Sequence, residues 1–114
     1  MIQLPGFERL WRSQGLPDED LQVLEAAITR DPVASPVVRG TGGLRKIRFV
    51  PSSRGKGKSG SMRVGYAQFP EFARIYLVTL FLKKDQENLS ATDRRAISSA
   101  LAALSDALRK GLNP

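Results

Sequence analysis

The chain has 114 residues, of which 41% are hydrophobic and 25% are charged, and it carries a net charge of +7. These values are ordinary for a globular protein, so we expect one folded domain over residues 1–114 rather than a disordered chain. Cysteine and histidine are both absent, which disfavours a disulfide scaffold, a metal or haem site, and catalysis by thiol or imidazole groups; we expect no cofactor.

Two amphipathic helices are predicted near the N-terminus. The first, over residues 5–14, begins at a proline and places three apolar side chains on one face, those of Phe7, Leu10 and Trp11. We interpret Trp11 as a core residue rather than a base-stacking one. The second helix begins near Pro17 and ends at Asp31-Pro32, because proline disfavours helical geometry in the residue before it. Its buried stripe is predicted to contain Leu21, Leu24 and Ile28.

The start of the second helix is acidic. Asp18, Glu19 and Asp20 complement the positive end of the helix dipole, and Glu25 follows on the next turns. A basic partner would be attracted to this surface. The opening MIQLPGFERL lacks the basic and then apolar pattern of a signal peptide, and no apolar run approaches a membrane span. We therefore expect a cytoplasmic protein without a membrane partner.

An alternating pattern follows the glycine-rich segment GTGG. In LRKIRFV, residues 44–50, Ile47 and Phe49 point to one side of a strand while Lys46 and Arg48 point to the other. The segment SMRVGYAQF, residues 61–69, is predicted to be a second strand, with Arg63 and the aromatic Tyr66 on opposite sides. The segment ARIYLVTLFL, residues 73–82, is apolar on both sides, as a central strand would be.

A basic loop separates the first two of these strands. Residues 52–61 read SSRGKGKSGS and contain no apolar side chain, so they cannot pack into a core. Arg54, Lys56 and Lys58 in this loop are able to reach a phosphate chain, and we interpret them as contacts to RNA.

The C-terminal segment LSATDRRAISSALAALSDALRKGL predicts a long helix. Ser90 and Asp93 resemble a capping box, and Gly111 follows the end. The apolar stripe consists of Ile97, Leu101, Leu104 and Leu108. The sequence therefore predicts an α+β fold, with N-terminal helices and a C-terminal helix packed on one face of a small antiparallel sheet and the cations on the other face.

The positive charge is concentrated in the middle of the chain. Residues 39–84 contain eleven Lys and Arg and a single acid, a net charge of +10, whereas the remaining residues have a net charge of −3. Such a field is typical of a protein that binds a polyanion, most often nucleic acid. The alternative is a solvated basic surface.

Five cations are predicted to converge on the free face of the sheet: Lys46, Arg48, Arg63, Lys83 and Lys84. Paired arginines can grip a phosphate and stabilise the extra negative charge of a pentacoordinate phosphorane. RNA supplies its own nucleophile, the 2′-hydroxyl group, so a protein needs to orient it, remove a proton and neutralise charge. A lysine whose pKa is lowered by neighbouring cations can act as the base.

Three ordered blocks resemble the HigB branch of the RelE/ParE toxin superfamily. They are GTGGLRKIRF, RGKGKSGSMRVGY and RIYLVTLFLKKDQENLSATDRRAI, and the resemblance extends from about residue 2 to about residue 105. It implies a RelE-like fold and a toxin of a type II toxin–antitoxin system, an mRNA interferase that cleaves messenger RNA on the ribosome without a metal and so inhibits translation and arrests growth.

The resemblance also implies roles for individual residues. Lys46 and Arg48 match the cations of the first strand, Arg63 matches the arginine that contacts the scissile phosphate, and Lys83 matches the lysine after the last long strand. We assign RNA or ribosome contacts to Arg45, Arg54, Lys56, Lys58, Lys84 and Tyr66, although alternation favours a core role for Tyr66. A helix-turn-helix antitoxin of the HigA type is expected on Asp18, Glu19, Asp20 and Glu25.

Two other functions remain open from the sequence. A ParE-like toxin shares the expected architecture and acts by binding DNA gyrase, but it does not need cations on one strand face. A non-catalytic RNA-binding or ribosome-binding protein needs bulk charge, usually with exposed aromatic side chains, and this chain has two Tyr and one Trp.

Overall fold

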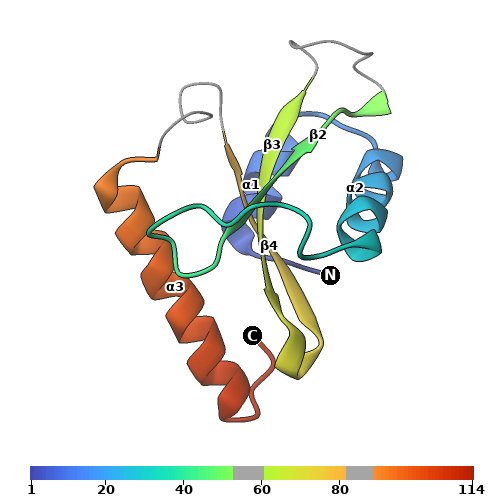
Figure 1. The fold of residues 1–114 in the computed structure, drawn as a ribbon. Coiled ribbons are helices and arrows are strands. Elements are labelled where there is room, and N and C mark those ends of the chain that lie inside the picture. The colour runs from blue at the N-terminus through green and yellow to red at the C-terminus, as the bar shows by residue number, and fades with distance from the viewer. Residues whose placement is uncertain (53–60, 82–88) are drawn as a thin grey trace.

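The computed structural model describes residues 1–52, 61–81 and 89–114, and within them the chain has an α+β architecture (Figure 1). The order of elements is β1 (Ile2–Gln3), α1 (Pro5–Ser13), α2 (Asp18–Arg30), β2 (Arg45–Phe49), β3 (Met62–Phe69), η3 (Pro70–Phe72), β4 (Arg74–Phe81) and α3 (Ala91–Arg109). The helices and the three longer strands confirm the expected elements, and the 3-10 turn η3 connects β3 to β4.

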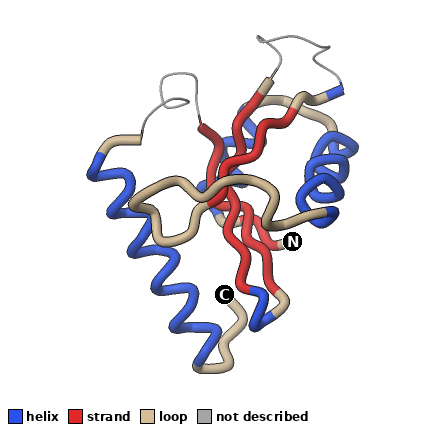
Figure 2. The backbone as a smooth tube through the Cα atoms, in the orientation of Figure 1, coloured by secondary structure: helices blue, strands red, loops and turns tan. Residues whose placement is uncertain are grey.

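The strands form one four-stranded sheet in the order β1-β4-β3-β2 (Figure 2). Strands β2, β3 and β4 are antiparallel neighbours, whereas β1 is parallel to β4, pairing Ile2 with Tyr76 and Gln3 with Leu77. The sheet is therefore mixed, and the expectation of an antiparallel sheet holds for three of its strands. The backbone N–H of Leu4 donates to the Leu77 carbonyl at 3.0 Å, which continues the pairing up to the start of α1.

One face of the sheet carries α1 and α2. Phe7 and Trp11 of α1 and Leu24 and Ile28 of α2 are buried against the strands. The strand residues in this cluster are Phe49, Met62, Val64, Tyr66, Leu77 and Leu80. The Trp11 ring stacks on Phe7 with centroids 5.7 Å apart, so Trp11 is a core residue, as helical spacing predicted.

The opposite face carries α3. Leu101 of α3 is buried in a second cluster with Leu44, Ala67 and Phe81, and Ile97 and Leu104 pack against it. Figure 1 shows α3 and α2 on opposite sides of the strands. The expectation that all helices share one face was therefore wrong. An apolar stripe shows that a helix packs on something, but it does not show on which face of the sheet.

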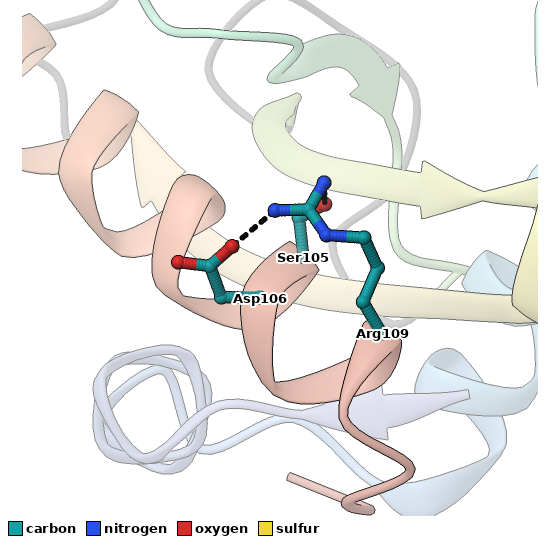
Figure 3. A network of polar contacts seen from close by, with 3 residues as sticks. All are labelled: Ser105, Asp106 and Arg109. Atoms are coloured by element: carbon teal, nitrogen blue, oxygen red, sulfur yellow. Dashed lines mark hydrogen bonds and ion pairs between the residues drawn. The ribbon is translucent and has the colours of Figure 1, made fainter.

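Side chains stabilise both ends of α3. Ser90 caps the N-terminus, because its Oγ accepts a 3.0 Å hydrogen bond from the backbone N–H of Asp93. In the last turn, Arg109 pairs with Asp106 and its Nη1 donates to Ser105 Oγ (Figure 3). This cation lies at the negative end of the helix dipole.

In the described part of the chain, no helix is long and apolar enough to cross a lipid bilayer.

Candidate nucleic-acid interface

Strand register brings the predicted catalytic cations of β2 and β3 together. Arg48 lies directly opposite Arg63, and Lys46 lies opposite Gly65 two positions along. Because alternate residues share a face, Lys46, Arg48 and Arg63 form one group, which we call the cation face. Phe81 of β4 pairs with Arg63 and lies on the same face. Two like charges directly opposite each other destabilise a sheet unless an anion lies between them.

Arg63 has an unsatisfied guanidinium nitrogen. Its Nη1 atom is buried and has no hydrogen-bond partner, although the side chain as a whole is half-buried. Leaving a buried donor unpaired costs about 1–3 kcal/mol, and more where the group is charged, and such groups are rare in folded proteins. Arg48 is exposed. An oxyanion bound between the two arginines would offset their repulsion, and a turn of the Arg63 side chain toward that anion would satisfy this donor.

Lys46 reaches across the sheet to β4. Its Nζ lies 4.8 Å from the centroid of the Phe81 ring, a cation–π contact. This contact attracts the charged ammonium form, so the geometry favours Lys46 as an electrostatic group over Lys46 as the base. The neighbour of Lys46 on β3 is Gly65, and a Cβ at Gly65 would lie 3.0 Å from Thr79 Cγ2 and 3.1 Å from both Leu44 methyl groups.

The need for glycine at position 65 was not predicted from the sequence. A side chain there would displace Leu44 or Thr79, directly beside Lys46 on the cation face. The sequence signal was a lone glycine inside a strand pattern, which often marks a place where another group approaches the backbone closely.

The glycine-rich segment before β2 packs on α3. Gly40 and Gly42 have φ values of +80° and +75°, which favour glycine. A Cβ on Gly40 would lie 3.4 Å from Arg94 Cδ, and one on Gly42 would lie 3.1 Å from Ser98 Oγ. Between them Thr41 is fully buried, and its hydroxyl group donates to the Val38 carbonyl and accepts from Leu44 N–H. The glycines of this loop therefore allow its backbone to pack closely against α3.

Two predicted RNA contacts point away from the cation face. Arg45 is half-buried, and its Nη1 donates to the carbonyls of Val33 and Ser35 at 3.1 and 2.7 Å. Tyr66 is 0% exposed and its hydroxyl donates to the Pro32 carbonyl at 2.6 Å. Both side chains hold the segment that follows α2. Tyr66 therefore cannot contact RNA, and the core interpretation of this residue is the one that its burial supports.

The acidic residues of α2 divide into two groups. Asp18 and Glu19 are exposed and Glu25 is half-buried, so these three can contribute to a partner surface. Asp20 is 0% exposed, and its Oδ1 accepts from Ser52 N at 3.1 Å and Ser52 Oγ at 2.9 Å. Asp20 therefore cannot be a surface contact for an antitoxin. Its position four residues before Leu24, on the buried stripe, was the sequence signal for this role.

Five predicted cations lie outside the residues that the structure describes: Arg54, Lys56, Lys58, Lys83 and Lys84. Within the described residues, no group of three or more Cys, Asp or Glu side chains is placed to hold a metal ion, and the chain has no His.

No protein-family model matches the chain.

Proposed function

We propose that this protein is a ribosome-dependent mRNA endoribonuclease, the toxin of a type II toxin–antitoxin pair. The observation that carries the proposal is the cross-strand pair of Arg48 and Arg63, with a buried and unpartnered Nη1 on Arg63. Two adjacent arginines suit a bound phosphate group. The resemblance of three sequence blocks to HigB toxins suggests messenger RNA as the substrate that carries this phosphate. The proposal includes a RelE-like fold, which is compatible with the mixed four-stranded sheet and three helices.

The reaction is a transesterification within the RNA chain. The 2′-oxygen attacks the adjacent phosphorus atom as its proton passes to a base. The bond from phosphorus to the 5′-oxygen then breaks, and the departing oxygen takes up a proton from water. The products are a 2′,3′-cyclic phosphate and a 5′-hydroxyl group, so atoms and charge balance without a metal. Arg63 stabilises the phosphorane and Arg48 positions the phosphate. Lys46 neutralises charge beside them, and the general base is then Lys83. Ordering of the mRNA by the ribosome supplies the in-line geometry.

The burial of the aromatic side chains favours an enzyme over a passive RNA-binding protein. Tyr66 and Tyr76 are 0% exposed and Trp11 is 7% exposed, so none of the three offers a surface on which bases can stack. The cation face in turn favours a ribonuclease over a gyrase-binding toxin, because protein binding does not require two arginines opposite each other on adjacent strands.

The proposed antitoxin contacts the surface around Asp18, Glu19 and Glu25. Its basic helix-turn-helix domain would be repelled by the cation face and attracted to this acidic surface. In this arrangement the antitoxin prevents the toxin from entering the ribosome and does not fill the site.

Induced expression in bacteria tests the proposal. Arg63→Ala should abolish growth arrest, because loss of one group that stabilises transition-state charge lowers the rate about 100- to 1,000-fold. The matched control is Arg95→Ala, which removes an exposed arginine from α3. Circular dichroism should show both variants folded. Full toxicity of folded Arg63→Ala would remove this residue from the mechanism.

A further inference from the structure

A groove of about 360 Å³ lies between β4 and the first half of α3. Its walls are formed by Val78, Thr79, Leu80, Phe81, Leu89, Asp93, Ala96, Ile97 and Ala100. Most of these side chains are apolar. The volume lies at the lower end of the range of about 300–1,000 Å³ that is typical of small-molecule sites, which suits a single planar ring system.

The groove adjoins the cation face. Phe81 lines the groove, pairs with Arg63 across the sheet and contacts Lys46 Nζ through its ring. Ile97 and Leu89, which also line the groove, pack against the core cluster that contains Phe81. A nucleotide whose phosphate lies on the cation face can therefore direct its base into the groove.

Asp93 gives the groove a chemical preference. It is the only charged residue among the described residues that line the groove, and it is exposed. Its backbone N–H bonds to Ser90, and its carboxylate belongs to neither of the two ion pairs found in the described part of the chain. A carboxylate accepts hydrogen bonds and donates none, so it selects a base edge with adjacent donors.

Guanine is the base that fits this requirement. Its N1–H and N2 amino group are neighbouring donors, which match the two oxygens of a carboxylate. Adenine and cytosine place a ring-nitrogen acceptor beside their amino group, and uracil places carbonyl groups on both sides of N3–H, so each would set an acceptor against Asp93. Single-stranded RNA exposes these Watson–Crick edges to proteins.

We propose that the groove between β4 and α3 binds one guanine base of the RNA, with Asp93 as the residue that determines the preference. This inference rests on the proposed function and adds to it a base preference at the cleavage site. The base lies against the apolar wall formed by Val78 and Ile97 while its phosphate lies on the cation face.

The four nucleoside 3′-monophosphates are the probes, and NMR titration of the full chain is the measurement. Guanosine 3′-monophosphate should bind at least about 10-fold more tightly than the other three, as expected for one bidentate contact. Asp93→Asn should remove this preference, whereas Asp106→Asn, on the same helix but outside the groove, should leave it unchanged. Ala100→Leu should block binding by filling the groove, whereas Ala103→Leu, equally exposed but outside it, should have no effect.

The result separates this inference from the proposed function. If the four nucleotides bind equally, or if Asp93→Asn keeps the guanine preference, the inference is wrong even where the protein cleaves mRNA on ribosomes. If guanosine 3′-monophosphate is preferred through Asp93 but ribosomal mRNA stays intact, the guanine site stands and the proposed reaction fails.

Discussion

The contact between the glycine-rich loop and α3 can be tested by adding a single methyl group. Gly42 has a φ of +75°, and a Cβ there would lie 3.1 Å from Ser98 Oγ and 3.5 Å from Ser98 Cα. Two costs follow in Gly42→Ala. The left-handed backbone costs about 1–2 kcal/mol for a residue with a side chain, and crowding against a packed helix adds about 1 kcal/mol. We expect the free energy of unfolding to fall by about 2–3 kcal/mol.

A matched variant isolates the contact. Gly15 has a φ of +65°, and a methyl group added there would have no heavy atom within 4 Å, so Gly15→Ala carries the backbone cost alone. Urea denaturation followed by circular dichroism gives the free energy of unfolding for each variant. Replacing Ser98 by Ala removes the nearest atom, so Gly42→Ala should cost about 1 kcal/mol less in a Ser98→Ala background than in the native chain.

Two results would refute this reasoning. If Gly42→Ala is no more destabilising than Gly15→Ala, with or without Ser98, the loop does not press on α3. If Gly42→Ala leaves stability unchanged but weakens RNA binding, the glycine-rich segment contacts RNA and not the helix.

Two further substitutions test residues that were expected to contact a partner at the surface and are buried in the structure. Asp20→Ala should lower the free energy of unfolding by about 1–3 kcal/mol, because it removes the acceptor of both Ser52 hydrogen bonds. The control Glu19→Ala, at an exposed position, should change the free energy of unfolding by less than about 0.5 kcal/mol. Equal effects of the two substitutions in urea denaturation would contradict the burial of Asp20. Tyr66→Phe should cost about 1 kcal/mol through loss of the bond to Pro32 while leaving the cleavage rate of the folded protein unchanged, and a large loss of activity at native stability would show that Tyr66 contacts RNA after all.

Local sequence patterns predicted the helices and longer strands of this fold well, because each of these elements depends on signals between residues close together in the chain. The proline at position 5, the Ser90 cap and the alternation of Lys46 with Ile47 are short-range signals, and the corresponding helices and strand are present. Strand β1 was missed because two residues are too few to show a period. The position of α3 was wrong because it depends on the face that Leu44 and Phe81 present to Leu101, residues far apart in the chain.

The candidate site was predictable only in part, because local patterns specify the face of a strand but not contacts between distant segments. Alternation correctly separated Arg63 from Tyr66, and register then placed Arg48 beside Arg63. The hydrogen bonds of Arg45 to backbone carbonyls and of Asp20 to Ser52 join segments 10 to 32 residues apart, and no local pattern specifies them. A Lys or Arg in the sequence therefore shows that a positive charge is present. The tertiary fold determines whether that side chain is available to a ligand or hydrogen-bonded to a backbone carbonyl group.

The most direct test of the central claim is cleavage of mRNA on purified ribosomes. The wild-type protein, incubated with programmed ribosomes in the presence of EDTA at a concentration that leaves the ribosome intact, should cut the mRNA and leave a 2′,3′-cyclic phosphate and a 5′-hydroxyl end. Arg63→Ala should cut about 100- to 1,000-fold more slowly, and Arg95→Ala should match the wild type. Intact mRNA with wild-type protein, or fragments ending in a 3′-hydroxyl and a 5′-phosphate, would contradict the account.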